Sequence, residues 1–169
     1  MTEPQLTTRT ATVRDAPAIV AIYNEGIADR IATFETSPRS VDQILDWFDD
    51  RHPIVIVLDE AGEIAGYAAT FSYADRCCYA GIAEFSVYVR RANRGQGVGV
   101  VGMKALIEEA AKAGFWKLLS RVFVENKASL ALLRSVGFRE VGVHEKHGKL
   151  DGDWRDVIAV ELILEANIT

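Results

Sequence analysis

The stretch that most constrains this chain is a predicted strand, residues 83–90, which breaks into a glycine-rich loop and resumes as a predicted helix. Along the strand, apolar residues alternate with Glu84, Ser86 and Tyr88, which share one face. In the loop, residues 95–99, glycine occupies every second position. A helix that begins directly after such a loop has unpaired backbone N–H groups and a dipole that favours negative charge. Because glycines remove the side chains that would block close approach, the stretch predicts a pyrophosphate site.

Two kinds of pyrophosphate ligand fit this stretch. Residues 97–102 have the Gly-x-Gly-x-x-Gly pattern of nicotinamide dinucleotide sites, and Glu125 follows the next predicted strand at about the right distance. Against this interpretation, too little chain follows Gly102 for further strand–helix repeats. Residues 94–99, Arg-Gly-Gln-Gly-Val-Gly, also fit the Arg/Gln-x-x-Gly-x-Gly/Ala loop that holds the pyrophosphate of acetyl-CoA. We favour acetyl-CoA, because several separate motifs agree with it in order.

Those other motifs are Ala-Thr-Phe-Glu at residues 32–35, Glu-Phe-Ser-Val-Tyr-Val at residues 84–89 and Trp-Arg-Asp-Val at residues 154–157. With the loop, they make residues 12–162 resemble the GNAT acetyltransferase superfamily. Within it, the chain is most similar to the phosphinothricin N-acetyltransferase family, which includes enzymes acting on methionine sulfoximine and arsinothricin. The resemblance implies one GNAT-type domain over residues 1–169, with acetyl-CoA as the acetyl-donor cosubstrate.

Length and composition agree with a small soluble enzyme. At 169 residues the chain has the length of a single domain, and we expect residues 1–9 to be a flexible N-terminus. The net charge of −5 and the lack of a basic face argue against nucleic-acid binding, and no apolar run is long enough to span a membrane. The two cysteines, Cys77 and Cys78, are adjacent, which rarely gives a structural disulfide or a metal site. A cytoplasmic location is the default expectation, and no metal is predicted.

The order of predicted elements indicates a mixed α+β fold. Asp15 is the expected N-cap of the first helix, Ser40 and Gln43 form a capping box for the second, and Asp151-Gly152 is a hairpin turn. Strands and helices are mixed rather than strictly alternating, so we expect a central mixed sheet, mostly antiparallel as in GNAT proteins, flanked by helices on both faces. Strands are predicted at residues 10–13, 54–58, 64–72, 83–90, 117–124, 138–143 and 156–164, and the longest helix at residues 98–113.

Acetyl transfer to an amine needs a base for the amine proton, donors for the thioester carbonyl and a route for the thiolate. Glu84, a carboxylate on the central strand just before the loop, suits the first task, and it matches the glutamate to which the phosphinothricin family's base role is assigned. GNAT enzymes often place a tyrosine, and this family often a histidine, seven residues after an asparagine, but counting from Asn126 gives Leu133. Tyr88, His144 or His147 could replace the missing proton donor.

The resemblance also implies which residues bind acetyl-CoA. Backbone N–H groups of the central strand would hold the thioester and the pantetheine arm, the loop would hold the pyrophosphate, and two side chains further on would contact the arm or the adenosine phosphates. These residues are Val87, Tyr88 and Val89 in the strand, Arg94, Gly95, Gln96, Gly97, Val98 and Gly99 in the loop, and Asn126 and Ser129 after the next strand.

For the acceptor, the resemblance points to Phe34, Glu35, Arg76 and Tyr79. Phe34 would form a wall, Glu35 would position an ammonium, and the arginine fork would bind a carboxylate, phosphinate or arsinate. Arg121 is expected at the surface. Lys149 and Trp154 resemble family positions near a dimer interface, so we expect a homodimer.

Four hypotheses follow. The first is an N-acetyltransferase for the α-amine of a small glutamate-like amino acid or toxin analogue, of phosphinothricin, methionine sulfoximine or arsinothricin type, which confers resistance. The second keeps the fold but acetylates another amine, such as a polyamine, or a protein N-terminus. The third is a non-catalytic acyl-CoA-binding module, and the fourth is the nicotinamide interpretation.

Overall fold

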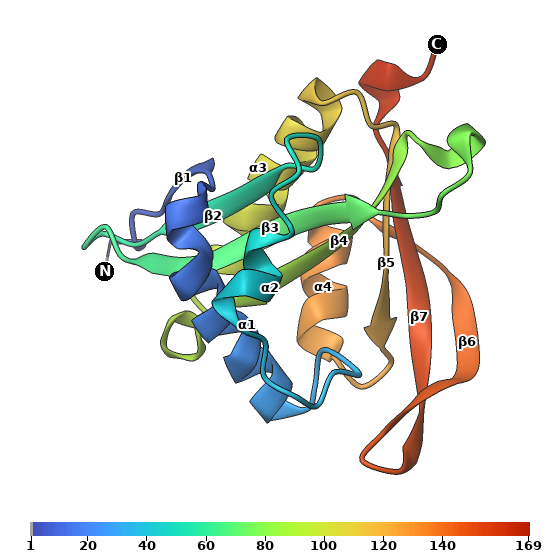
Figure 1. Cartoon of the computed structure of the whole chain (residues 1–169), viewed down its shortest axis with the longest axis horizontal. Helices are drawn as coiled ribbons and strands as arrows, with labels where there is room; N and C mark the ends of the chain where they lie inside the picture. The colour runs from blue at the N-terminus through green and yellow to red at the C-terminus, as the bar shows by residue number, and fades with distance from the viewer. Residues whose placement is uncertain (1) are drawn as a thin grey trace.

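The computed structural model describes residues 2–169 and contains a seven-stranded sheet with the order β1-β2-β3-β4-β5-β7-β6 (Figure 1). Only β4 and β5 pair in parallel, so the sheet is mostly antiparallel, as expected. The strands are β1 (Thr7–Thr10), β2 (Ile54–Leu58), β3 (Ile64–Ser72), β4 (Ile82–Val89), β5 (Lys117–Phe123), β6 (Arg139–Leu150) and β7 (Asp153–Ile163). The α-helices are α1 (Ala16–Asp29), α2 (Val41–Leu45), α3 (Val98–Lys112) and α4 (Lys127–Ser135).

Helices cover both faces of the sheet (Figure 1). On one face, α1 and α2 pack through Ile19, Ile22 and Ile44 on β2 and β3. On the other face, α3 and α4 pack through Met103 and Leu130 on β3, β4 and β5. Strand β2 is buried on both faces, which explains why its sequence is apolar without alternation. Among residues 2–169, no helix combines the length and the apolar character needed to cross a membrane.

The sheet opens between β4 and β5. Their parallel pairing runs from Ile82 and Lys117 only to Glu84 and Leu119. Beyond that point β4 stays paired with β3 as far as Val89, and β5 stays paired with β7, while the two strands run apart (Figure 1). The side of β4 that faces this opening has no strand partner in the described part of the chain. The divergence places a gap beside Glu84, in front of the start of α3.

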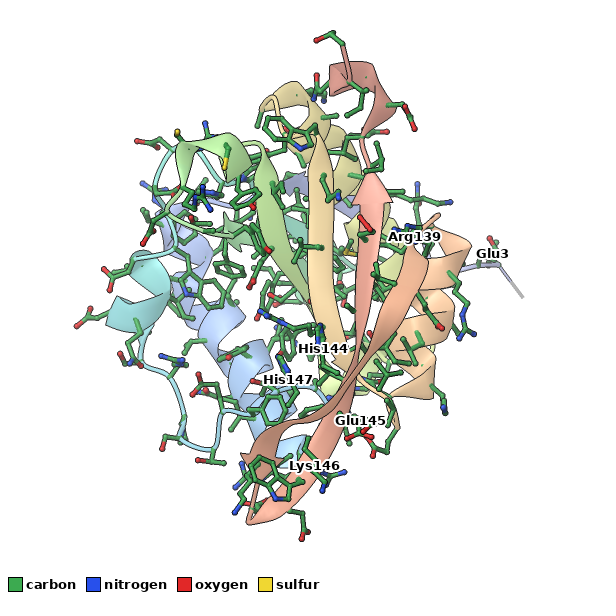
Figure 2. All side chains as sticks on the ribbon, turned by 90° about the vertical axis from the view of Figure 1, so that its right-hand side faces the viewer. Glu3, Arg139, His144, Glu145, Lys146 and His147 are labelled. Carbon is green, nitrogen blue, oxygen red and sulfur yellow. The ribbon has the colours of Figure 1, made fainter. Side chains whose placement is uncertain are left out.

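Strands β6 and β7 form a long hairpin at the edge of the sheet. Its turn is Asp151-Gly152, with φ of 51° and 89°, as the sequence predicts. The register shifts between His144 and Gly148, so that three residues of β6 lie opposite Asp156 alone. This bulge brings the rings of His144 and His147 to 4.8 Å, side by side in Figure 2. Bulges of this kind redirect side chains, often next to active sites.

The N-terminal prediction needs a correction. The first strand is β1, which begins at Thr7 and pairs with β2, so residues 7–9 are not part of a flexible terminus. The predicted strand at residues 10–13 is wrong, because Val13–Asp15 form a 3-10 turn. Asp15 does not cap α1 with its side chain. Its carboxylate instead accepts a hydrogen bond from the Thr12 backbone N–H at 2.8 Å and two from Arg9, at 2.8 and 3.0 Å.

The second helix is correctly predicted at its start but is shorter than its sequence pattern suggests. Ser40 and Gln43 form the capping box, with backbone-to-side-chain hydrogen bonds of 2.9 and 3.3 Å. Of the apolar residues in this helix, Ile44 is fully buried, whereas Val41 and Leu45 are each 37% exposed. The helix ends after five residues, so a single turn is all that packs on α1.

Candidate active site

A cavity of about 470 Å³ occupies the gap between β4 and β5. It is lined by the end of α1, the second half of β4, the glycine loop, the start of α3, the end of β5 and the first turns of α4. We call it the cofactor cleft. Of the residues predicted to bind acetyl-CoA, the structure brings together Val87, Tyr88, Val89, Arg94, Gly95, Gly97, Val98, Gly99, Asn126 and Ser129 on its walls, but not Gln96.

The start of α3 faces this cleft with free donors. The first hydrogen bond that the loop carbonyls accept within the helix runs from Val101 N–H to Gly97 O, at 3.1 Å, so the N–H groups before it have no helical acceptor. Gly95 and Gly97 have φ of 78° and 82°, and a Cβ added at either would meet nothing within 4 Å. The backbone conformation therefore requires glycine there, and the space in front of the donors is open. These features fit a bound pyrophosphate.

The later glycines of the nicotinamide pattern have a different role. A Cβ added at Gly99 would lie 2.2 Å from Leu132 Cδ1, and one at Gly102 would lie 3.2 Å from Val57 Cγ2. Both glycines thus let α3 pack closely on α4 and β2, and Gly99 also lines the cofactor cleft. The nicotinamide interpretation is wrong, because the sheet around the loop is mainly antiparallel and lacks repeated strand–helix units.

Charged groups surround the entrance beside the loop. Asp29, at the end of α1, accepts a hydrogen bond of 2.7 Å from Arg91 and forms an ion pair with Arg94 at 2.6 Å. The hydrogen bond from Arg91 and the pairing with Arg94 lower the pKa of the Asp29 carboxyl. The pairing also anchors the guanidinium of Arg94, whose charge lies beside the helix start.

A second cavity, of about 390 Å³, adjoins the cofactor cleft. Glu84 lines it, together with the loop after α1, the end of β5 and the β6–β7 hairpin. The two cavities share Ala32, Ser120 and Arg121. We call the second one the acceptor cavity. It is lined by Ala32, Thr33, Phe34, Glu84, Ser120, Arg121, Phe123, His147 and Val157.

Glu84 enters the acceptor cavity from the last position of β4 that pairs with β5. Its side chain is 29% exposed, and Oε1 accepts a hydrogen bond of 2.8 Å from Nη2 of Arg121. Leu119 is the β5 partner of Glu84, so Arg121 lies two residues further on the same face. Arg121 is exposed, as the sequence predicted, but its pairing with Glu84 was not predicted. The strand alignment that would have revealed it involves residues 37 positions apart.

Phe34 forms part of the wall of the acceptor cavity. Its ring meets Phe123 edge-on at 4.8 Å and packs with Leu150 and Val157. A Cβ added at Gly148 would come within 2.9 Å of the Phe34 ring, so the glycine lets the hairpin approach the loop. The loop and the hairpin therefore form one wall.

The structure does not bring the other predicted acceptor residues to this cavity. Glu35 accepts a hydrogen bond of 2.7 Å from Arg39 and lies outside both cavity walls. Arg76 and Tyr79 belong to the exposed segment before β4, where the guanidinium lies over the tyrosine ring at 5.9 Å. A hydrogen bond of 2.6 Å from Arg51 to the Ala80 carbonyl joins their segment to the residues before β2. Arg76 and Tyr79 lie before the start of β4, whereas the glycine loop follows its end.

Two residues of the cofactor cleft were considered as positions for a proton donor to the leaving thiolate. Leu133 is 1% exposed and packs in the core beneath the cofactor cleft. Tyr88 lines the cleft, and burial raises the pKa of its phenol, which therefore keeps its proton throughout the neutral range. Its ring lies so close to α1 that a Cβ added at Gly26 would be 2.6 Å from it.

Comparisons with known proteins agree with this geometry. Residues 19–138 match the model of the acetyltransferase (GNAT) family. The chain is 35% identical over 161 residues to the L-methionine sulfoximine/L-methionine sulfone acetyltransferase of Pseudomonas aeruginosa, covering 93% of this chain and 94% of that protein. It is 28% identical over 149 residues to the phosphinothricin N-acetyltransferase of Streptomyces coelicolor, covering 85% of this chain and 87% of that protein.

A solved structure extends the likeness to the whole fold. The phosphinothricin acetyltransferase of Sinorhizobium meliloti, solved in complex with acetyl-CoA, superposes with a TM-score of 0.86 at 28% identity and covers 96% of this chain and 89% of that one. The family model alone spans well over half of the chain. The chain belongs to the GNAT family of acetyltransferases.

Proposed function

We propose that this protein is an acetyl-CoA-dependent N-acetyltransferase that acetylates the α-amine of a small glutamate-like amino acid or toxin analogue, of phosphinothricin, methionine sulfoximine or arsinothricin type, and so confers resistance. The observation that carries the proposal is the position of Glu84, whose carboxylate lines a small cavity that adjoins a cleft with a free helix start. The names of the relatives from Pseudomonas and Streptomyces support the class of acceptor.

Acetyl-CoA supplies the acetyl group as an activated thioester. The free N–H groups at the start of α3, with Gly95 and Gly97 leaving room, bind the pyrophosphate. The unpaired edge of β4 at residues 87–89 offers backbone N–H and carbonyl groups to the pantetheine arm and a donor to the thioester carbonyl. Asn126, whose side chain caps α4 by accepting a hydrogen bond of 3.2 Å from Ser129 N–H, lies along the same wall.

Glu84 acts on the acceptor. An α-amine is mostly protonated at neutral pH, and only the free amine can attack a thioester. Glu84 takes that proton, directly or through one water, and the nitrogen lone pair then forms the new bond to the acetyl carbon. Tyr88 keeps its phenol proton and can donate a hydrogen bond to the departing sulfur, although burial makes it a weaker acid for complete proton transfer. The coenzyme A thiolate is a tolerable leaving group, so this hydrogen bond contributes less than the transfer to Glu84.

The charges of the acceptor cavity favour an amino acid over the other amines considered. A polyamine site needs acidic walls, whereas this cavity sets Arg121 and His147 beside Glu84. A volume of about 390 Å³ suits a small molecule rather than a protein N-terminus, which needs an open groove.

We also infer a homodimer in the cytoplasm. Support for the dimer is the exposed hairpin at the sheet edge, where Val141, Val143 and Trp154 are each more than half exposed. Lys149 lies over the Trp154 ring at 4.8 Å. Exposed, unbridged Cys77 and Cys78 suit a reducing compartment.

A coenzyme-release assay tests the proposal. We expect the protein to release coenzyme A from acetyl-CoA in the presence of L-methionine sulfone, L-methionine sulfoximine or phosphinothricin. We expect no release with spermidine or an alanine-terminated peptide. A thermal-shift comparison should show stabilisation by acetyl-CoA and coenzyme A but not by NADH. Release with the peptide or the polyamine alone would contradict the proposed acceptor, and stabilisation by NADH alone would contradict the proposed cofactor.

A further inference from the structure

Arg121 is the cation of the acceptor cavity. Among residues 2–169, no other arginine or lysine lines that cavity, and Arg121 also lines the cofactor cleft, so it lies where the two meet. Its side chain is 43% exposed. The proposed mechanism gives Arg121 no step. Arg76, the arginine predicted from the sequence to bind the acceptor, lies outside both cavities.

The guanidinium of Arg121 has donors to spare. A guanidinium carries five N–H groups in a planar fork. In the described part of the chain, one of them, on Nη2, donates to Oε1 of Glu84 at 2.8 Å, and the side chain makes no other hydrogen bond. The remaining donors can bind an anion bidentately without the loss of a structural contact.

The Arg121–Glu84 pair matches the charges of a zwitterionic amino acid. In such a molecule the α-ammonium and the α-carboxylate are attached to one carbon atom. In the acceptor cavity, a carboxylate and a guanidinium lie in direct contact, with the guanidinium nearer the shared walls. A carboxylate bound to Arg121 would therefore leave the amine of the same molecule beside Glu84, which is the geometry that proton removal requires.

We propose that Arg121 binds the carboxylate of the amino-acid acceptor. When the acceptor binds, the guanidinium moves from Glu84 to this carboxylate. This inference rests on the proposed function. In the free enzyme Arg121 neutralises Glu84. In the acceptor complex the guanidinium turns to the carboxylate of the substrate, and Oε1 of Glu84 becomes available for the amine proton. An amine without a neighbouring carboxylate would leave the original ion pair in place and would be a poor acceptor.

A comparison of two acceptors in matched variants tests this role. L-methionine sulfone and its carboxamide carry the same amine and the same side chain, but only the first has a carboxylate. The variants are Arg121→Gln and Arg121→Lys, with Arg139→Gln as the control. Arg139 is an exposed arginine that pairs with Glu161 at the far end of β6, where Figure 2 labels it. Binding is measured by calorimetry in the presence of coenzyme A, and turnover by coenzyme release.

For Arg121→Gln, we expect the affinity for the acid to fall about tenfold to a hundredfold, the usual scale for a hydrogen-bonded contact with a charged group. The affinity for the carboxamide should change less than about threefold. Arg121→Lys should keep part of the affinity for the acid, and Arg139→Gln should behave like the parent. Comparing variants with one acceptor at a time cancels the difference in basicity between the two amines.

Other results would overturn the assignment. Equal losses for acid and carboxamide would mean that Arg121 only stabilises Glu84 or the cavity wall. An unchanged affinity for the acid, or a parent protein that prefers the carboxamide, would also contradict it. Failure of the proposed function would look different: the parent would bind the acid in an Arg121-dependent manner but release no coenzyme A from acetyl-CoA.

Discussion

At the scale of single residues, the proposed chemistry depends on one carboxylate. Glu84 stands at the last paired position between β4 and β5, and its carboxylate has one hydrogen-bond partner, Arg121, in the described part of the chain. A carboxylate placed in an apolar strand is costly to bury without a partner. The opening of the sheet solves this problem, because it leaves the group partly exposed within a cavity instead of in the core.

Glu84→Gln tests the base directly. The amide keeps the size and polarity of the side chain but cannot take the amine proton. We expect a folded protein with normal acetyl-CoA affinity and a turnover lower by roughly a hundredfold or more, the usual contribution of general base catalysis. Raising the pH should restore part of the loss, because more amine arrives deprotonated. Glu140→Gln, at an exposed carboxylate of β6, is the matched control. Parent-like turnover of Glu84→Gln at neutral pH would assign the base role to another group.

At the scale of elements, one junction shapes the site and a second stabilises the fold. The first is the loop before α3, where glycines serve two different purposes. Gly97 has a left-handed backbone and open space around it, whereas Gly99 lies against Leu132 of α4. The sequence pattern treats the two positions alike. Only the packing of α3 on α4 shows that Gly97 has open space around it and that Gly99 contacts Leu132.

Substitution of these two glycines by alanine should therefore give different results. Gly97→Ala forces a side chain into a left-handed conformation at a cost of about 1–2 kcal/mol, and it should weaken acetyl-CoA binding in a protein that still folds. Gly99→Ala places a methyl group 2.2 Å from Leu132 Cδ1. Because Cδ1 is the end of a flexible side chain that can rotate away, we expect the free energy of unfolding to fall by only about 1 kcal/mol. Urea unfolding and calorimetry with acetyl-CoA measure the two effects. An unchanged acetyl-CoA affinity in folded Gly97→Ala would remove the loop from the cofactor site.

The second junction joins β1 to α1 through the Arg9–Asp15 pair. The hydrogen bond from Arg9, helped by the Thr12 N–H, lowers the pKa of the Asp15 carboxyl. A lowered pKa in the folded state means that the pair stabilises the fold above the ordinary aspartate pKa, and that this stability is lost as the pH falls through the lowered value. Asp15 is 7% exposed, but the Arg9 side chain is 45% exposed, so solvent partly screens the pair.

Asp15→Asn should accordingly reduce the free energy of unfolding at pH 7 by roughly 1–2 kcal/mol, the scale of a hydrogen bond to a charged group. The parent should lose stability more steeply than the variant between about pH 5 and pH 2. Urea unfolding at several pH values measures the two slopes, with Asp75→Asn, on an exposed loop, as the control. Parallel pH profiles for parent and Asp15→Asn would contradict the assigned ion pair.

At the scale of the whole molecule, the long β6–β7 hairpin forms one exposed edge of the sheet. Strand β6 is a sheet edge, and nearly all of its side chains are exposed. Val143 of β6 and Trp154 of β7 leave apolar surface on the hairpin. An edge strand with exposed apolar groups is prone to pair with another chain. The expected homodimer would cover this edge.

Analytical ultracentrifugation tests the dimer. We expect the parent to sediment as a dimer and Val143→Lys to shift it toward the monomer, since a lysine would carry charge into an apolar contact. Val13→Lys is the control, because Val13 and Val143 are equally exposed, at 56% and 55%, but Val13 lies next to β1 at the other edge of the sheet. A monomeric parent, or a dimer that Val143→Lys leaves intact, would remove the hairpin from the interface.

The sequence by itself determined the features that depend on neighbouring residues. The glycine loop before α3, the capping box at Ser40 and Gln43, and the Asp151-Gly152 turn each rest on bonds within a few positions, so local patterns predicted them. The mixed sheet and the cofactor loop followed from the resemblance and from these signals. Predictions at strand ends were less accurate, as at β1, because pairing with a distant strand determines where a strand begins.

Only the tertiary structure decided which distant residues share the acceptor cavity. The parallel alignment of β4 and β5 stops at Glu84, which brings Arg121 to its carboxylate across 37 positions of sequence. The bulge in β6 brings His147 to the same cavity, while Arg76 stays outside it. Strand register and the divergence of the sheet arise from the packing of helices on both faces and from long-range pairing. No local sequence pattern encodes the sum of those contacts, so only the fold determines which of these residues meet.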